Sequence, residues 1–333
     1  KADPYCTIIN IFDFFAGPGR DVDGRDGSPI LALREIEPYK EQIGSKGLCV
    51  NLFLNEYQKK KALSLEAVVK ECSGSDVPVS IHITSEDFAD IFQKYHPLMN
   101  TAKTANFIFL DQSGIKHITQ DVFAAITSVK QTDFLFFISS STINRFCENE
   151  EIRRYINIPP DAIKCQPYDH IHRAVCDYYR DHLPASREYY LAPFSIKKGS
   201  NIYGLIFGSG HVYGIDKFLH TCWKQDPERG EANYDIDDDR LTPEQPSLFN
   251  HMNKPKKLSS FAQRLTEAIL SRRVRSNRDI YKFSLAYGCL PSHGKDVFRS
   301  LIQDGKLPKQ KIPPVSYDSW KSVKEQAIEL SID

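Results

Sequence analysis

The sequence lacks several features that would assign it to a membrane, an extracellular scaffold or a zinc ribbon. In 333 residues, no apolar run approaches the ~18 residues that a membrane-spanning helix needs, and no charged-then-apolar leader opens it. The first residue is Lys1 rather than Met, which leaves open a segment upstream of this numbering. Eight scattered cysteines include no C-x-x-C pair. They indicate reduced thiols in a cytoplasmic protein, with neither a disulfide framework nor a metal site. From the missing apolar run we expect no membrane partner.

The chain also lacks net charge, because 43 basic side chains balance 43 acidic ones. The balance is uneven: between Lys254 and Lys311 there are fourteen Lys or Arg against four Asp or Glu, an excess of ten. Such asymmetry is typical of a basic module that meets a polyanion. A solvated helical surface explains it equally well.

Strand and helix patterns alternate through the first two thirds of the chain. Five apolar, β-branched or aromatic runs predict buried parallel strands at 6–15, 48–56, 78–84, 105–114 and 133–141. Two further runs, at 187–198 and 201–210, predict an antiparallel pair around Lys198-Gly199-Ser200. The pattern predicts an α/β, Rossmann-like sheet closed by an antiparallel β-hairpin.

Composition divides the chain further. We expect a Rossmann-like domain over 1–225, with 144–187 as a helical insertion over the edge of the sheet. Residues 226–257 are rich in proline and acids and then basic, and they are interpreted as a linker. Three short amphipathic helices with glycine breaks follow, so 258–333 is expected to be a basic winged-helix-like module.

A glycine turn follows the first predicted strand in "DFFAGPGRDVDGRDGSP", Asp13 to Pro29. Arg20 follows the second glycine, and no GK[ST] of a Walker A loop occurs nearby. A dinucleotide fingerprint opens a helix at once, whereas here a charged loop comes first and a helix is expected with Ser28 as its N-cap. Neither ATP nor NAD fits this stretch well.

S-adenosylmethionine suits the stretch better, because its sulfonium and amino groups are cationic. Asp13 would attract them, and the turn of Ala16, Gly17 and Gly19 would let the backbone pass close to the methionine part. Glu56 ends the second strand, where an acid accepts ribose hydroxyls in Rossmann-like sites. Asp87 follows the third strand, in position for the adenine amine. Each acid alone is more often a helix cap or a first-turn charge.

With these motifs, the chain resembles the three-Cys-motif partner family (TcmP), predicted methyltransferases of bacteria and their mobile elements. The matching stretches are "FAGPGR" with "GSPILAL", "FLNE", "INRF" and "YGLIFGSGHVYGIDKFLHTCWKQDP", and the basic tail resembles the family's winged-helix-like end. The resemblance is nearly full length. It implies a class I methyltransferase fold, S-adenosylmethionine and a radical-SAM-like partner with a three-cysteine motif.

The expected catalytic residue is Asp111, at the end of the fourth strand. Amine-directed methyltransferases place an acid or amide there to accept the acceptor's proton, with an aromatic side chain that stacks on a flipped base. The family usually has a sequence like Asp-Pro-Phe-Gly, but this chain has "DQSG", with Gln112 and Ser113 in place of proline and the aromatic. His117 is a further candidate base, or simply a surface residue. A catalytically degenerate fold, acting as a scaffold or sensor, is therefore the alternative.

Other residues are candidates for binding substrate. Asn144 and Arg145 follow the fifth strand, where an Arg can grip a phosphate. His211, between glycines after the last strand, is expected to face the same edge of the sheet. His172 and Cys176 lie four apart and could share a zinc ion, but a packed aromatic helix explains them better.

The basic module suggests nucleic acid. A helix is expected to begin near Ser292-His293 and to enter a major groove as in a helix-turn-helix; a protein-docking winged helix is the alternative. The expected phosphate or base contacts are Arg272, Arg273, Arg275, Lys295 and Arg299.

The leading hypothesis is thus a methyltransferase acting on nucleic acid. A nuclease or an ATPase is disfavoured, because the sequence shows neither paired metal-site acids nor a Walker motif.

Overall fold

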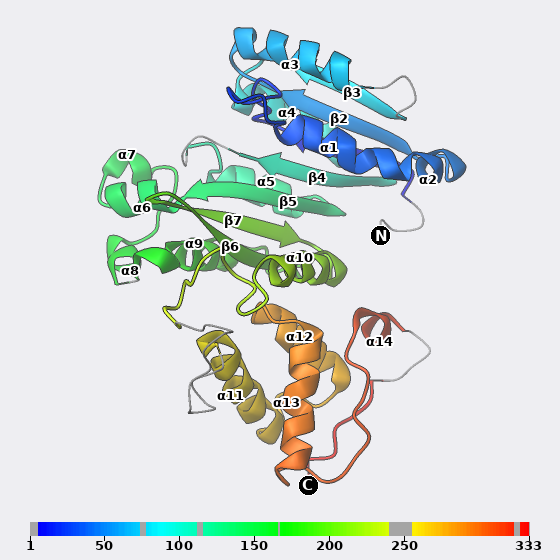
Figure 1. The fold of residues 1–333 in the computed structure, drawn as a ribbon, viewed down its shortest axis with the longest axis vertical. Helices are drawn as coiled ribbons and strands as arrows, with labels where there is room; N and C mark the ends of the chain where they lie inside the picture. Colours follow the sequence, from blue (N-terminus) through cyan, green and yellow to red (C-terminus); the bar gives the residue numbers. More distant parts are fainter. Residues whose placement is uncertain are drawn as a thin grey trace. The chain divides into compact units, whose positions relative to one another are not determined.

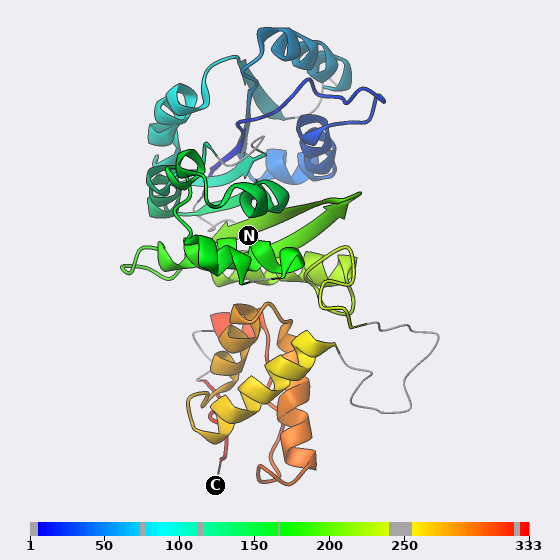
Figure 2. The same ribbon diagram turned by 90° about the vertical axis from the view of Figure 1, so that its left-hand side faces the viewer.

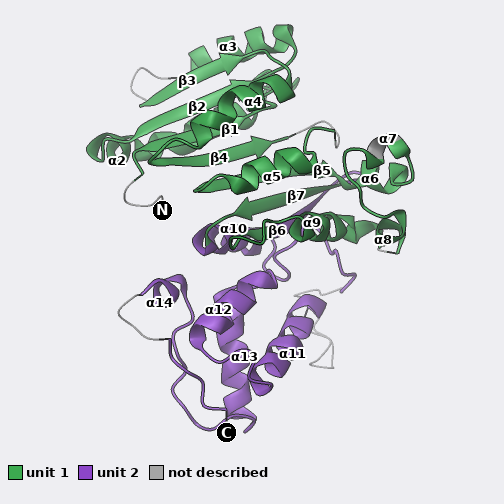
Figure 3. Ribbon diagram, turned by 180° about the vertical axis from the view of Figure 1, so that it is seen from behind, with its two compact units in different colours: residues 1–191, 203–211 green, residues 192–202, 212–333 purple. Residues whose placement is uncertain are grey.

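The computed structural model describes residues 6–73, 78–111, 116–165, 167–239, 255–322 and 327–332. The chain divides into two compact units (Figure 3), and they are taken one at a time below. Unit 1 comprises 1–191 and 203–211, and unit 2 comprises 192–202 and 212–333.

The fold is α/β and is organised around a seven-stranded mixed sheet in the order β3-β2-β1-β4-β5-β7-β6 (Figure 1). Strands β1 to β5 run parallel to one another, whereas β7 is antiparallel to β5. The order reverses direction between β1 and β4, which is the switch point where open α/β sheets bind ligands. The strands are β1 (Ile8–Asp13), β2 (Cys49–Asn55), β3 (Val79–Thr84), β4 (Thr104–Leu110), β5 (Thr132–Ser139), β6 (Tyr190–Lys198) and β7 (Asn201–Ser209).

Helices cover both faces of the sheet in unit 1. Ile30 and Leu33 of α1 and Leu65 of α3 join one apolar cluster, while α4, α5 and α9 contribute to a larger cluster on the other face. Parallel strands buried on both faces read as continuous apolar runs, which explains why the sequence predicts them well. The helices of unit 1 are α1 (Ser28–Ile36), α2 (Lys40–Ser45), α3 (Lys59–Cys72), α4 (Phe88–Met99), α5 (Gln120–Ser128), α6 (Ser140–Phe146), α7 (Glu150–Arg153), α8 (Pro160–Lys164) and α9 (Ile171–Asp181), with single 3₁₀ turns at Glu37–Tyr39 and Tyr168–His170.

The predicted insertion, 144–187, is mostly helical and belongs to the core of unit 1. Ile156, Ile163 and Val175 are buried in the larger apolar cluster. This segment therefore contributes packing, beyond covering an edge of the sheet.

Unit 2 contains α10 (Val212–Gln225), α11 (Lys256–Leu270), α12 (Asn277–Ala286), α13 (Pro291–Gln303) and α14 (Tyr317–Lys321), the last four coloured yellow to red in Figure 2. Helices α12 and α13 approach so closely that a Cβ on Gly294 would lie 2.4 Å from Ser284 Oγ. The wing of a winged helix is a pair of β-strands after the last helix. The described residues after α13 form only an isolated β-bridge, in which Glu329 pairs with Ser276. The helical part of the predicted module is present, and its wing stays a prediction.

The division into units differs from the sequence-based boundary at 225. Helix α10 and residues 226–239 belong to the same compact unit as the C-terminal helices. Of the expected linker, 226–239 includes the buried residues Arg229, Ala232 and Ile236, and 240–254 lie outside the described residues. In the described part of the chain, no helix is both long and apolar enough to cross a bilayer.

Candidate functional site

Four acidic residues follow four parallel strands and so lie at one edge of the sheet. Asp13 is the last residue of β1, Glu56 follows β2, Asp87 follows β3 and Asp111 follows β4. In the sheet register Asp13 pairs with Leu54 and with Phe109, each of which comes two residues before the next acid, Glu56 or Asp111. The structure therefore places these predicted residues at the carboxyl edge.

Asp13 is the most buried of these acids, with 4% of its surface exposed. Its Oδ2 accepts a 2.6 Å hydrogen bond from Ser28 Oγ, and its Oδ1 accepts one from the Phe15 backbone N–H. Burial raises the pKa of Asp13 to about 6; these hydrogen bonds oppose the rise, and the charges of Asp111 and Glu56 add to it. A cation placed here would favour the ionised carboxylate.

The Asp13–Ser28 contact changes the role expected for Ser28. Helix α1 begins at Ser28 itself, its N-cap is Gly27, and no side chain caps it. The expectation that Ser28 is the N-cap is thus wrong, because its hydroxyl donates to Asp13 instead. Sequence patterns did not reveal this contact, since a Ser before a Pro is usually a capping signal.

Glu56 is also buried, with 9% of its surface exposed. Its Oε1 accepts a 2.8 Å hydrogen bond from the Gln58 backbone N–H, and its own N–H donates to Thr84 O of β3. These contacts fix the carboxylate at the end of β2 with acceptor capacity remaining.

The glycine turn is built from tight backbone geometry. The N–H of buried Ala16 donates to Asn55 O at 2.9 Å, tying the turn to β2. Gly17 and Gly19 have φ of +63° and +84°, which side chains other than glycine rarely adopt. A Cβ on Gly19 would also lie 3.2 Å from Leu65 of α3, whereas the space beside Gly17 is open.

The charged loop after the turn is held at its base. Arg20 forms ion pairs with Asp26 (3.1 Å) and Glu71 of α3 (3.0 Å), and the Gly27 N–H donates to Gly19 O. The side chain of Val22, by contrast, is fully exposed at the tip. This loop, residues 20–28, is called the strap below; its two ends are held together beside the glycine turn.

Asp111 has an exposed side chain, and partial desolvation by surrounding atoms raises its pKa. The rest of the expected catalytic turn, Gln112, Ser113 and Gly114, lies outside the described residues. The described chain resumes at Lys116, and the ring centroid of His117 lies 5.1 Å from that of Phe15 and 5.3 Å from that of Phe88. The His117 ring therefore contacts one aromatic ring just after β1 and another at the start of α4.

Asn144 and Arg145 are exposed on α6, which directly follows β5. Their helix thus begins at the carboxyl edge, as expected. Arg145 lies over the Phe146 ring at 5.9 Å, and nearby Ser141 Oγ and Tyr168 Oη are 2.6 Å apart. These side chains give α6 a polar and aromatic surface.

The expectation that His211 faces the same edge is wrong. Because β7 runs antiparallel to β5, its last residue, Ser209, pairs with Asp133 near the start of β5. His211 follows Ser209, and its charge acts on Asp133. It is thus at the opposite edge of the sheet from Asp13, and strand direction, which the apolar run does not reveal, explains the error.

The histidine and cysteine motif on α9 is part of the core. His172 and Cys176 are buried, with 0% and 1% of their surfaces exposed. Among the described residues, no group of three or more His, Cys, Asp or Glu is placed to hold a metal ion. The packed-helix interpretation therefore describes the segment better than a zinc site does.

In unit 2, the predicted basic contacts fall into two sets. Arg272, Arg273 and Arg275 are exposed in the loop between α11 and α12, whereas Lys295 and Arg299 are partly buried on α13. The first turn of α13 packs within the unit, since the His293 ring lies 4.3 Å from that of Trp223 of α10. His293, at the expected start of the recognition helix, is thus partly buried, and the arginine loop is the more exposed basic surface.

The motif "WKQDP", residues 223–227, has a structural role. Trp223 Nε1 donates to Gly288 O, and Lys257 Nζ lies 5.6 Å from its ring centroid. A Cβ on Gly230 would lie 2.4 Å from the same ring, and its φ is +61°. Trp223 therefore joins α10, the following turn and the C-terminal helices of the unit.

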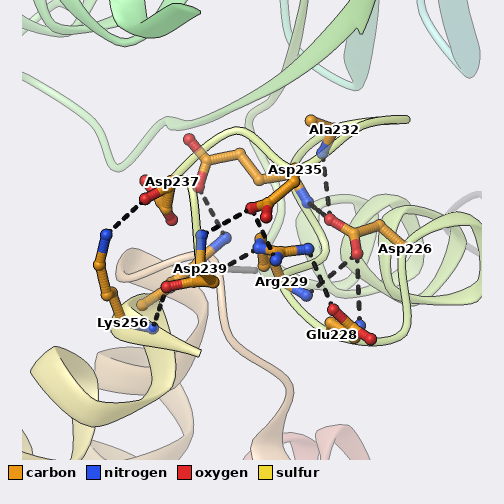
Figure 4. A network of polar contacts seen from close by, with 10 residues as sticks. Asp226, Glu228, Arg229, Ala232, Asp235, Asp237, Asp239 and Lys256 are labelled. Carbon is orange, nitrogen blue, oxygen red and sulfur yellow. Dashed lines mark hydrogen bonds and ion pairs between the residues drawn. The ribbon is translucent and has the colours of Figure 1, made fainter. Parts of the chain in front are cut away.

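A buried polar network completes this turn (Figure 4). Asp226 accepts hydrogen bonds from four backbone N–H groups, those of Glu228, Arg229, Glu231 and Ala232. The guanidinium of Arg229, whose surface is 5% exposed, forms ion pairs with Glu228 (3.1 Å), Asp235 (2.7 Å) and Asp239 (2.9 Å). The acidic residues of 226–239, which the sequence suggested were part of a linker, thus mostly form hydrogen bonds and ion pairs within this folded segment.

Comparisons with known proteins add little to this geometry. A scan against protein-family models and a search of curated proteins find no match. Among solved structures, the chain is similar to a putative methyltransferase, yhhF, from Escherichia coli (10% identity, 61% of this chain, 78% of that chain, TM-score 0.27).

It is also similar to geranyl diphosphate C-methyltransferase from Streptomyces coelicolor A3(2) (14% identity, 63% of this chain, 76% of that chain, TM-score 0.28), solved with S-adenosyl-L-homocysteine. TM-scores this low carry no argument, so the site is interpreted from its own residues.

Proposed function

We propose that the chain binds S-adenosylmethionine at the carboxyl edge of its sheet and is a methyltransferase of the class I type. One observation carries the proposal: Asp13, Glu56 and Asp111 converge beside a glycine turn at the switch point of the sheet. A cationic cofactor would offset the cost of three nearby carboxylates, which would oppose an anionic phosphate. The TcmP resemblance supports the same cofactor.

Each acid has a proposed role that its surroundings support. Asp13 would hold the cationic methionine part, and Glu56, buried beside the end of β3, would accept the ribose hydroxyls. Asp111, exposed after β4, would accept a hydrogen bond from the methyl acceptor. The strap 20–28 flanks this edge, and Asn144 and Arg145 would contact the acceptor.

The alternative is a binding or sensor protein that keeps the cofactor site without catalysis. The sequence Gln112-Ser113 favours it, because neither residue supplies the stacking ring of amine-directed enzymes. If the scaffold alternative is correct, Asp111→Ala will leave the cellular function intact while cofactor binding persists. Loss of function in that variant, with binding preserved, would favour catalysis.

We also propose a nucleic acid as the methyl acceptor and a three-cysteine protein as the partner, each on a single observation. Arg272, Arg273 and Arg275 form an exposed cationic loop suited to phosphate contacts of a nucleic acid. The three-cysteine, radical-SAM-like partner follows from the TcmP resemblance alone.

Calorimetric titration with S-adenosylmethionine and S-adenosylhomocysteine tests the cofactor. We expect both to bind, and Glu56→Gln to weaken binding of S-adenosylhomocysteine by about tenfold or more, as for loss of a hydrogen bond to a charged group. Glu66→Gln is the matched control, because Glu66 is an exposed acid on α3. No binding by the folded wild-type chain would refute the proposal; equal binding by Glu56→Gln would refute only the ribose assignment.

A further inference from the structure

An aromatic cluster lies at the carboxyl edge beside Asp13. The rings of Phe15 and Phe88 stack with centroids 5.2 Å apart and planes inclined by 23°. The His117 ring contacts both, at 5.1 Å from Phe15 and 5.3 Å from Phe88. Phe88 is buried beneath, whereas Phe15 and His117 are partly exposed. The cluster thus presents an aromatic surface to solvent at this end of the edge.

A carboxylate accompanies this surface. Asp87 is exposed at the start of α4, directly before Phe88, and its Oδ1 accepts a hydrogen bond from the Ala89 N–H. Its charge acts on His117: burial lowers the pKa of His117, and Asp87 opposes this without reversing it. At neutral pH the His117 ring is therefore uncharged, which suits stacking on a neutral heterocycle.

The combination matches one ligand chemistry. A planar heterocycle needs an aromatic face, and an exocyclic amine needs an acceptor such as a carboxylate. Adenine has both features. It is also the base of the cofactor proposed above, whose methionine part would lie at the glycine turn that begins immediately after Phe15.

We propose that His117 closes the adenine end of the cofactor site, with Phe15 as its stacking partner and Asp87 as the acceptor for the exocyclic amine. This inference rests on the proposed function. It assigns His117, which lies between β4 and α5 in the chain, to cofactor binding and specificity rather than to proton transfer.

The test compares S-adenosylhomocysteine with S-inosylhomocysteine, in which a carbonyl replaces the exocyclic amine. Wild-type protein should prefer S-adenosylhomocysteine by about tenfold or more, because the carbonyl would face the Asp87 carboxylate. Asp87→Asn should narrow this preference, since an amide can donate to the carbonyl. Calorimetry at pH 7.5 measures all four affinities.

His117 is tested with the same ligands. His117→Ala should weaken binding of S-adenosylhomocysteine at least about fivefold, as expected for loss of one stacking contact, while His117→Phe should retain affinity. His82→Ala is the matched control: the His82 ring also stacks on a phenylalanine, Phe53, at 4.7 Å, but in the middle of paired β2 and β3. Thermal unfolding of each variant confirms that it is folded.

The outcomes separate the two proposals. If wild-type protein binds neither ligand, the cofactor proposal fails. If wild type binds S-adenosylhomocysteine but folded His117→Ala binds it equally well, only the present inference fails. If His117→Ala instead abolishes binding of free adenosine to protein already saturated with S-adenosylhomocysteine, the aromatic surface holds an acceptor base, and the assignment to the cofactor is overturned.

Discussion

The two units treat buried carboxylates in opposite ways. In unit 2, Asp226 accepts four backbone hydrogen bonds, and Asp239 is paired with buried Arg229. In unit 1, Asp13 is also buried, but it accepts only one side-chain and one backbone hydrogen bond. Burial, with a contribution from the nearby charges of Asp111 and Glu56, raises the pKa of Asp13 to about 6. A buried acid with a complete set of partners stabilises the fold. A buried acid with a raised pKa, such as Asp13, lacks such partners, and a bound cationic ligand would stabilise its ionised form.

Removing the cation from the paired network should have the largest effect. Arg229→Met leaves the buried Asp239 carboxylate without its counter-ion, and we expect a loss of about 3–5 kcal/mol in the free energy of unfolding. Urea denaturation of the full chain measures it. Arg25→Met is the control, because Arg25 is exposed and lies 3.8 Å from Asp23. An equally small change in both variants would contradict the structural role of the network.

Neutralising one acid from each unit should shift stability in opposite directions. Asp13→Asn should raise the free energy of unfolding at pH 7.5 by up to about 3 kcal/mol, because a rise of roughly two pKa units costs about 1.4 kcal/mol each, and it should abolish binding of S-adenosylmethionine. Asp226→Asn should lower stability by about 1–3 kcal/mol, since its amide cannot accept all four hydrogen bonds. Destabilisation by both variants would remove the contrast between the units.

A pH series should sharpen the contrast. The pKa of Asp13 is higher in the folded chain than in the unfolded chain, so its contribution favours folding at low pH and is lost as pH rises from about 4 to about 6. Cofactor affinity should change in the opposite direction, weakening below pH ~6 as Asp13 becomes protonated.

Ser28 provides the check on this series. Its hydrogen bond lowers the pKa of Asp13, so Ser28→Ala should move the loss of affinity to higher pH, and Ser28→Thr should restore the wild-type profile. Calorimetry from pH 5 to pH 8 measures both. Superimposable profiles for wild type and Ser28→Ala would show that Ser28 does not position Asp13.

The smallest effect is expected at the opposite edge of the sheet. His211→Ala should leave the affinity for S-adenosylhomocysteine unchanged, because β7 carries His211 away from Asp13. A clear loss of affinity in this variant would mean that the cofactor does not occupy the carboxyl edge.

The sequence predicts the parallel strands and the acids that follow them, because each buried strand is a continuous apolar run with a polar residue at its end. For this reason it predicts the position of Asp13, Glu56 and Asp87 at the carboxyl edge, while their contacts with a cofactor stay a prediction. It misplaces His211, since an apolar run is the same in either direction, and only pairing with β5 reveals the reversal.

Contacts between distant residues are harder to predict. The pairing of Arg229 with Asp235 and Asp239 follows no helical or strand period, so a folded turn resembles an open linker in composition. The hydrogen bond from Ser28 to Asp13 joins residues fifteen apart, and the ring contact of His117 with Phe88 joins residues on α4 and before α5. Only the three-dimensional structure brings these residues together.

The division of the chain has a consequence for how it can be cut into fragments. The polypeptide passes from one unit to the other after residues 191, 202 and 211. A cut at the composition boundary near residue 226 falls inside unit 2, and the fragment after it would lack Trp223, whose indole donates to Gly288 O between α12 and α13. A fragment that begins at Val212 would keep α10 together with these helices.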